Sequence, residues 1–131
     1  MFDSSRVFSS FSVDDIASAS GFYGGTLGLA VTEVPEMGLL TLSVGGGRGV
    51  MLYAKDDHAP SSYTVLNFPV DDIDAVVDEL TGRGVRFERY EGFAQDEKGI
   101  ARPASPEQGP PIAWFTDPAG NILAVLEERE G

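Results

Sequence analysis

One six-residue segment occurs twice in this chain. Residues 11–16 read FSVDDI and residues 68–73 read FPVDDI, so the copies differ at one position and lie 57 residues apart. Each copy follows an alternating run typical of a strand and precedes an apolar stretch with helical spacing. A repeat of this size cannot close a core alone, because it buries too little apolar surface. We therefore expect two βαβββ halves that combine their sheets around a shared interior.

The paired aspartates of each copy have a structural explanation. Asp14 or Asp15 in the first copy, and Asp71 or Asp72 in the second, stand where a side chain would cap the following helix. The apolar residues of the second helix share one face, namely Ile73, Val76, Val77 and Leu80. Capping accounts for both copies by one mechanism, so we prefer it to acid–base catalysis by the aspartates.

The same pattern predicts one helix and four strands in each half. The first half has strands at 6–13, 29–34, 38–44 and 49–54, and a helix from Ile16 to Leu27. The second half has strands at 63–70, 85–90, 111–116 and 121–127, and a helix that begins at Ile73. Two turns join the last strands of each half, Gly45–Gly49 and Asp117–Asn121. The glycine cluster lacks the Lys-Ser/Thr of a phosphate loop, so we interpret it as a hairpin turn.

Length and composition agree with one domain. Of the 131 residues 42% are hydrophobic, so we expect a single domain over 1–131, with repeats at 6–54 and 62–128 joined by a linker at 55–61. No apolar run approaches the roughly 18–20 residues of a membrane span, and no signal segment opens the sequence. We therefore expect a cytoplasmic protein with no membrane partner. The absence of cysteine excludes disulfides, thiolate nucleophiles and cysteine-based zinc sites.

The formal charge of −12 argues against nucleic acid or an anionic membrane surface as a partner. A cationic ligand would be attracted by such a protein. The alternative is that the acidic residues only form a solvated surface, since charge alone does not say where they lie.

One connection is too long for a plain linker. Residues 91–110 form a polar loop rich in glycine and proline, and a loop of this length in a compact domain is often a lid. We expect Phe93 to be its apolar tip. The polar side chains that could contact a ligand are Gln95, Asp96, Glu97, Lys98 and Arg102.

Three segments of the chain resemble a known family. FSVDDIASASGFYGGTLGL, NFPVDDIDAVVDELTGRGVRF and IAWFTDPAGNILAVLEE are similar to the motifs of the glyoxalase/bleomycin resistance/dioxygenase family, the vicinal oxygen chelate superfamily. The resemblance implies an α+β fold in which two βαβββ repeats pair into a U-shaped mixed sheet around a cavity, usually in a homodimer. It leaves function open, because the family includes metal-dependent enzymes and metal-free binding proteins.

The resemblance also indicates where a metal would bind. The family's metalloenzymes place His, Gln or Glu ligands at four positions, which here are Phe8, Met51, Val65 and Ala124. None of these is a ligand for a hard divalent ion, and a lone thioether does not hold one. His58 is the only histidine, so one chain cannot supply two. We therefore expect no metal cofactor.

Strand alternation predicts what would line the cavity instead. If Phe8 marks the concave side of its strand, the residues on that side include Ser10 and Ser12, while Val7, Phe11 and Val13 lie under the helix. The same rule places further side chains in the cavity, namely Met51, Tyr53, Tyr63, Val65, Asn67, Ile112, Trp114 and Thr116. With Phe93 and Asp96 from the loop, the set suits a flat or apolar small molecule. The alternative is that some of these residues fill the interior or a dimer interface.

Two functions from different classes follow. The favoured hypothesis is a metal-free, dimeric protein that binds a small molecule and sequesters an aromatic or cationic, antibiotic-like ligand. The alternative is a diverged enzyme of the family, a lyase, isomerase or dioxygenase, with a non-standard site. For His58 we weigh an exposed loop histidine against a polar or acid–base group at the cavity mouth. A subunit that works through protein contacts is a third alternative.

Overall fold

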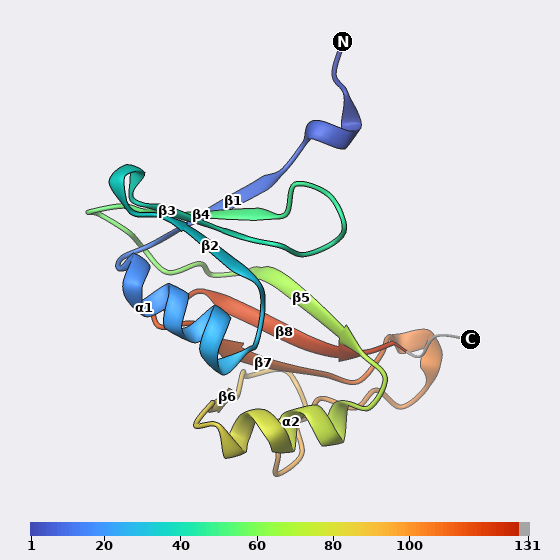
Figure 1. Ribbon diagram of the computed structural model, residues 1–131. Coiled ribbons are helices and arrows are strands. Elements are labelled where there is room, and N and C mark those ends of the chain that lie inside the picture. The colour runs from blue at the N-terminus through green and yellow to red at the C-terminus, as the bar shows by residue number, and fades with distance from the viewer. Residues whose placement is uncertain (129–131) are drawn as a thin grey trace. The chain divides into compact units, whose positions relative to one another are not determined.

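The computed structural model describes residues 1–128 of the chain. The chain separates into two compact units, which we call unit 1 (Met1–Pro60) and unit 2 (Ser61–Gly131). In each unit a strand, a helix and three further strands follow in order, as the repeat predicts (Figure 1). Each unit has its own mixed four-stranded sheet, with strand order β1-β4-β3-β2 in unit 1 and β5-β8-β7-β6 in unit 2. The predicted α+β class is confirmed.

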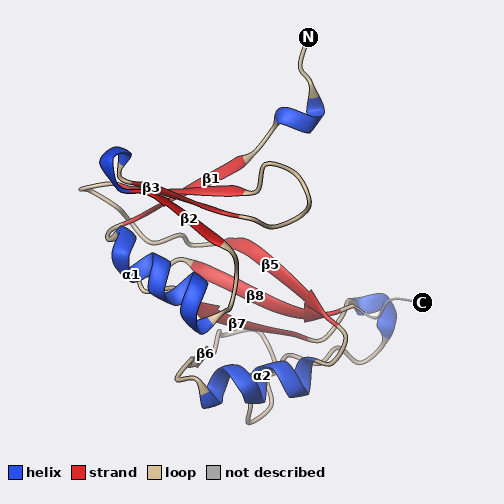
Figure 2. Ribbon diagram, viewed as in Figure 1, coloured by secondary structure: helices blue, strands red, loops and turns tan. Residues whose placement is uncertain are grey.

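Unit 1 packs a short helix against one face of its sheet. Its elements are β1 (Ser9–Val13), α1 (Ile16–Ser20), β2 (Val31–Val34), β3 (Leu39–Leu42) and β4 (Val50–Ala54). β1 pairs with β4 in parallel, and the other neighbours are antiparallel (Figure 2). The core consists of side chains from alternate strand positions and the helix, namely Val13, Ala19, Tyr23, Leu40, Leu42 and Leu52.

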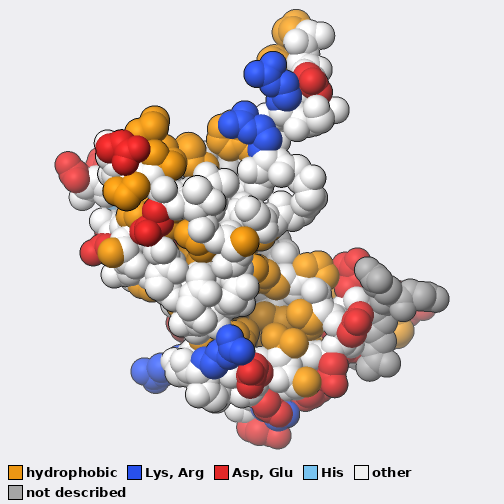
Figure 3. Space-filling model, viewed as in Figure 1, with side chains coloured by type: hydrophobic (Ala, Val, Ile, Leu, Met, Phe, Trp, Pro, Cys, Tyr) orange, Lys and Arg blue, Asp and Glu red, His pale blue; other side chains and the backbone are white. Residues whose placement is uncertain are grey.

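Unit 2 repeats this plan with a longer helix. Its elements are β5 (Thr64–Val70), α2 (Ile73–Gly82), β6 (Phe87–Glu88), β7 (Ile112–Thr116) and β8 (Ile122–Glu127). On the packed face the Phe115 ring lies 6.4 Å from the Phe68 ring and 5.6 Å from the Phe87 ring, measured between centroids. The buried side of α2 supplies Ile73, Val77 and Leu80. The opposite side of α2 is acidic, and Figure 3 shows acidic side chains gathered over this part of unit 2.

The predicted helix caps are confirmed in both repeats. The carboxylate of Asp15 accepts a hydrogen bond of 3.1 Å from the backbone N–H of Ser18, and Asp72 accepts one of 3.1 Å from Ala75. Each bond satisfies one of the N–H groups that a helix leaves unpaired at its start. The second aspartate of each pair is therefore the cap.

The first helix has the predicted extent but two different geometries. After Ser20 it continues as a π-helix over Gly21–Thr26, where the N–H of Leu27 bonds to the carbonyl of Phe22 at 2.9 Å. Glycine is a poor α-helix former, so packing decides the local geometry in this glycine-rich turn. The wider turn buries Tyr23, whose ring lies 6.4 Å from that of Phe11.

Both predicted turns are confirmed. In Gly45–Gly49 the last residue has a φ of +81°, and a Cβ there would collide with the carbonyl oxygen of Leu42, so only glycine fits. In the second turn the buried Asp117 carboxylate accepts bonds from the backbone N–H of Ala119 and Asn121 at 3.0 and 2.8 Å. The N-terminal residue of this turn thus holds it closed, as an aspartate in such a turn commonly does.

The first strand begins later than predicted. Pairing starts at Ser9, whose partner Val50 is the first residue of β4, so residues upstream have no strand to pair with. Ser4–Arg6 form a 3-10 turn, and the Val7 side chain is 68% exposed. The expectation that Val7 packs under the helix is therefore wrong.

The strand predicted at 85–90 is only two residues long. Phe87 and Glu88 pair with β7, but farther along the same edge Ile112 pairs with Ala101, which comes from the long loop. The loop therefore takes over part of the sheet edge that a longer β6 would have occupied. No helix within residues 1–128 has the length and apolar character needed to cross a membrane.

The long loop is fastened to its own unit at its centre. Ile100 is fully buried, and Arg102 Nη2 donates to Asp74 Oδ1 on α2 at 2.7 Å. Lys98 Nζ lies 3.1 Å from a carboxylate oxygen of Asp78. The hydrogen bond from Arg102 holds the pKa of Asp74 below its ordinary value, so the carboxylate stays ionised down to pH values below the usual aspartate range. The middle of the loop is thus anchored, which a freely closing lid would not be.

This anchoring predicts a local effect of removing the Asp74 charge. Asp74→Asn weakens the contacts with Arg102 and Lys98, so trypsin should cut the Lys98–Gly99 bond about threefold faster or more. The bond after Arg102 is no site for trypsin, because Pro103 follows it. Asp71→Asn makes the same charge change at an exposed residue before α2 and should digest like the wild type. Equal cleavage rates in both variants and the wild type would show that the ion pairs do not hold the loop.

Candidate functional site

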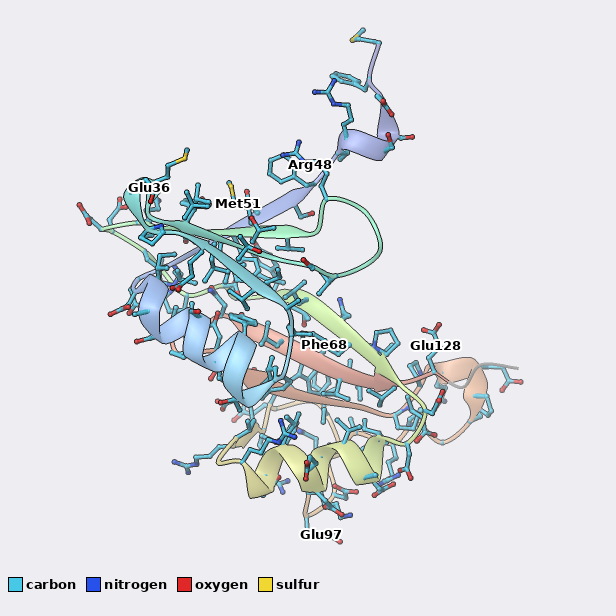
Figure 4. The ribbon with its side chains drawn as sticks, in the orientation of Figure 1. Glu36, Arg48, Met51, Phe68, Glu97 and Glu128 are labelled. Carbon is cyan, nitrogen blue, oxygen red and sulfur yellow. The ribbon has the colours of Figure 1, made fainter. Side chains whose placement is uncertain are left out.

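The sheet of unit 1 has one face directed away from α1. Residues paired across adjacent strands point to the same side of a sheet, so Ser10, Met51 and Thr41 share this face. Ser12 and Tyr53 form the next pair on it. Met51, labelled in Figure 4, points away from α1. The alternation predicted for Ser10, Ser12, Met51 and Tyr53 thus agrees with the register.

Phe8 precedes β1 and contacts a positive charge. The guanidinium carbon of Arg48 lies 4.1 Å from the centroid of the Phe8 ring, in cation–π geometry, and the ring is 41% exposed. The position that resembles a metal-ligand site therefore carries an aromatic ring with a cation from the same unit on its face.

His58 lies against the unit 1 sheet. Its Nδ1 is 2.6 Å from Ser12 Oγ, and the ring is half-buried, so the alternative of an exposed loop histidine is wrong. The backbone N–H of His58 bonds to the carbonyl of Lys55 at 3.0 Å, which makes the turn that brings the ring back. The polar alternative for His58 is thus supported in its position on unit 1, while its role at a cavity mouth stays a prediction.

The sheet of unit 2 has an aromatic cluster on the face opposite its packed phenylalanines. The register aligns Asn67, Ala124, Trp114 and Glu88 across all four strands. The Trp114 ring lies 5.5 Å from the Tyr90 ring and 4.9 Å from the Phe93 ring, between centroids. We call Tyr90, Phe93 and Trp114 the aromatic cluster. The predicted residues Phe93 and Trp114 are therefore in contact, and Phe93 remains 55% exposed.

A β-bulge changes the start of β5 from what simple alternation predicts. The register shifts between Thr64 and Leu66, so Val65 has no partner and Thr64 aligns with Ile122, on the face of Ala124. Thr64 takes the place that alternation gave to Val65. Tyr63 comes before the strand and is 68% exposed, and its carbonyl accepts the Ser61 hydroxyl at 2.7 Å. A ligand contact for Tyr63 or Val65 stays a prediction.

Asp96 uses both carboxylate oxygens within the loop. Oδ1 accepts from the backbone N–H of Lys98 and Ile100, each at 2.9 Å, and Oδ2 accepts from Arg102 Nε at 3.0 Å. Burial acts to raise the pKa of Asp96, but these hydrogen bonds outweigh it and the net shift is downward. Asp96 therefore organises the loop that carries Phe93. A direct contact between Asp96 and a ligand stays a prediction.

Sequence reasoning missed Glu88 and Tyr90. Glu88 pairs with Trp114 and so points to the same face, and Tyr90 is two residues farther along. Burial raises the pKa of Tyr90, and the negative charge of Glu88 raises it further. The signal was present in the strand predicted at 85–90, because the apolar residues Val85 and Phe87 assign the alternate residues to the other face.

The four positions at which the family's metalloenzymes bind a metal do not fit one here. Phe8 and Val65 have hydrocarbon side chains, Ala124 is fully buried with no donor atom, and Met51 has only a soft thioether. Within residues 1–128 no three His, Asp or Glu side chains are close enough together to hold a metal ion.

Unit 2 also has a hollow that sequence analysis did not predict. Its volume is about 600 Å³ and it lies between the end of the long loop and β8. Its lining combines prolines with charged residues and includes Arg102, Pro103, Pro106, Pro110, Pro111 and Glu127. The aromatic cluster takes no part in it.

Comparisons with known proteins place the fold. A family model described as the Glyoxalase/Bleomycin resistance protein/Dioxygenase superfamily matches residues 8–125. A solved structure of a member of this superfamily from Sphaerobacter thermophilus DSM 20745 is 27% identical, with a TM-score of 0.64 over 93% of this chain and 97% of that chain. No curated protein matches the sequence.

Two further solved structures show the fold alone, since their identity is low. TnmS3, an antibiotic binding protein from Streptomyces sp. CB03234, is 24% identical, with a TM-score of 0.60 over 94% of this chain and 96% of that chain. The fosfomycin resistance protein FosX from Listeria monocytogenes is 10% identical, with a TM-score of 0.70 over 94% and 92%. The family model covers nearly the whole chain, so this protein belongs to the glyoxalase/bleomycin resistance protein/dioxygenase superfamily.

Proposed function

We propose that this protein binds a small, flat organic molecule on the aromatic cluster of unit 2 and needs no metal to do so. The observation that carries the proposal is the position of Trp114. The ring stands on the sheet face opposite the packed phenylalanines, is only half-buried, and has Tyr90 and Phe93 at its side.

The composition of this face supports the proposal. Aromatic rings offer a large apolar area and favour stacked or edge-on contact with a second ring. Asn67 is exposed in the same row of the sheet and can both donate and accept a hydrogen bond. A surface with aromatic area and a few polar groups is typical of sites that orient a small organic ligand.

The absence of ligand side chains at the four family positions supports binding without a metal. Sequestration requires no reacting group, so apolar residues at Phe8, Met51, Val65 and Ala124 are compatible with it. The antibiotic-binding protein TnmS3 and the fosfomycin resistance protein have the same fold, so this fold accommodates antibiotic-related functions in other proteins. An aromatic or cationic antibiotic is accordingly the kind of ligand we propose.

One observation favours the alternative of a diverged enzyme. Ser12 and His58 are hydrogen-bonded on the sheet face of unit 1, and such a pair can move a proton. Ser12 lies within a strand and not in a nucleophile-elbow turn, so the pair lacks the setting of a known serine hydrolase. We therefore rank binding above catalysis.

Substitutions on the two faces of β7 should separate binding from stability. Trp114→Ala should weaken binding of the flat neutral probe 1-methylquinolin-2-one at least tenfold, while costing about 1 kcal/mol of unfolding free energy. Phe115→Ala, one residue away on the packed face and 1% exposed, should cost about 3–5 kcal/mol. Binding is measured by NMR shifts of the Asn67 side-chain amide, and stability by urea unfolding.

The reverse pattern would contradict the proposed site. If Trp114→Ala unfolds as easily as Phe115→Ala, the ring belongs to the core. If Trp114→Ala is stable and binds the probe as the wild type does, the ligand site lies elsewhere.

Metal analysis provides the second test. Protein purified without chelator or metal-affinity resin should contain far less than one equivalent of any transition metal, and divalent ions should not raise its Tm. Stoichiometric metal would overturn the proposal and favour the enzyme. Such a metal would have to bind away from the four family positions, because the residues there do not fit one.

A further inference from the structure

We infer that Glu88 is the anionic anchor for an organic cation whose flat part stacks on the aromatic cluster. This inference rests on the proposed function and adds the charge class of the ligand and the residue that selects it. The chemical class is an aromatic amine or quaternary ammonium compound.

The register places the Glu88 carboxylate beside the ring that would bind the ligand. Glu88 and Trp114 are directly opposite each other in β6 and β7, and side chains in such pairs are neighbours on one face. Tyr90 follows on the same side and contacts Trp114. A ligand stacked on Trp114 therefore has this carboxylate at one edge.

The Glu88 side chain is poorly compensated within the protein. Among the described residues its carboxylate makes no ion pair and accepts no hydrogen bond, although the side chain is half-buried. Its backbone carbonyl is satisfied by Gln95 Nε2 at 2.9 Å, so the strand itself is held in place. A bound cation would give this half-buried carboxylate the partner that it lacks within the protein.

Nearby carboxylates have the opposite arrangement. Asp74 and Asp96 are both paired with Arg102, and Asp78 is paired with Lys98. The adjacent Arg89 donates to the carbonyl of Glu97 at 3.0 Å. Arg89, Lys98 and Arg102 are thus engaged elsewhere, and no described basic side chain pairs with Glu88.

The behaviour of Tyr90 supports this placement. The pKa of the Tyr90 hydroxyl is raised mainly by burial and further by the negative charge of Glu88. The Glu88 carboxylate therefore lies close enough to Tyr90 to affect its ionisation. Aromatic faces attract cations through their ring quadrupole, and an adjacent carboxylate adds direct charge attraction. A site with both elements discriminates a cation from a neutral molecule of equal shape.

Two probes of nearly equal shape test the inference. The 1-methylquinolinium cation and the neutral 1-methylquinolin-2-one are both flat N-methyl bicycles, and each is titrated while the indole N–H resonance of Trp114, the single tryptophan, is followed. Glu88→Gln should weaken binding of the cation at least tenfold and change binding of the neutral probe less than about twofold. Glu107→Gln, an equal charge change at an exposed loop residue, should bind both probes like the wild type.

The outcomes separate the anchor from the site. If both probes bind but Glu88→Gln and Glu107→Gln affect the cation equally, general attraction to the charge of −12 explains the preference and the anchor is wrong. If neither probe shifts Trp114 in the wild type, the proposed binding function fails together with the anchor.

A measurement on the wild type covers the case in which Glu88→Gln does not fold. The wild type should prefer the cation over the neutral probe about tenfold, and most of that preference should persist in 0.5 M NaCl. Salt screens attraction to distant charges much more strongly than a contact between a bound cation and a half-buried carboxylate. Loss of the preference in salt would overturn the anchor.

Discussion

Within residues 1–128 each sheet has one α-helix packed against one of its faces, and this constraint organises the chemistry of the chain. In unit 2 the alternating residues Phe68, Phe87 and Phe115 pack together, so the residues between them face the other way. In unit 1 Leu40, Leu42 and Leu52 are buried in the same manner. The residues on the opposite face of each sheet are thereby determined, because the neighbours of every inward residue in a strand point to the other side. Candidate functional groups therefore collect on two predictable surfaces.

The aromatic cluster depends on the anchoring of the long loop. Phe93 belongs to a loop, where an exposed ring would ordinarily be mobile. Buried Ile100, the hydrogen bonds of Asp96 and those of Gln95 to Glu88 and Gly99 hold the loop on its unit. The ring of Phe93 thus meets Trp114 in the unbound protein. A site formed in advance loses less conformational freedom on binding than a lid that must close first.

Sequence reasoning succeeded where the deciding interaction is local. The caps at Asp15 and Asp72 act within three residues, and the Asp117 turn within four, so short patterns predicted them. It failed where the deciding partner is distant in the sequence. Val7 is exposed because β4 begins only at Val50, and Thr64 replaces Val65 on the Ala124 face because of a bulge against β8. For the same reason the sequence could place Glu88 on a face but could not show that its carboxylate lacks a partner.

The lack of metal-ligating side chains at the four family positions is chemically consistent with the presence of the aromatic cluster. A hard divalent ion needs several oxygen or nitrogen donors, and such groups are costly to bury beside apolar rings unless the ion compensates them. At Phe8 and Ala124 the chain has no donor to compensate, and Ala124 gives Trp114 an apolar neighbour on the β8 side. A charge at the edge of that row, on Glu88, is then far enough from the packed side to remain partly solvated until a cation replaces the water. The face of unit 2 around Trp114, which has no metal ligand at Ala124, is therefore chemically compatible with the organic cation that we propose.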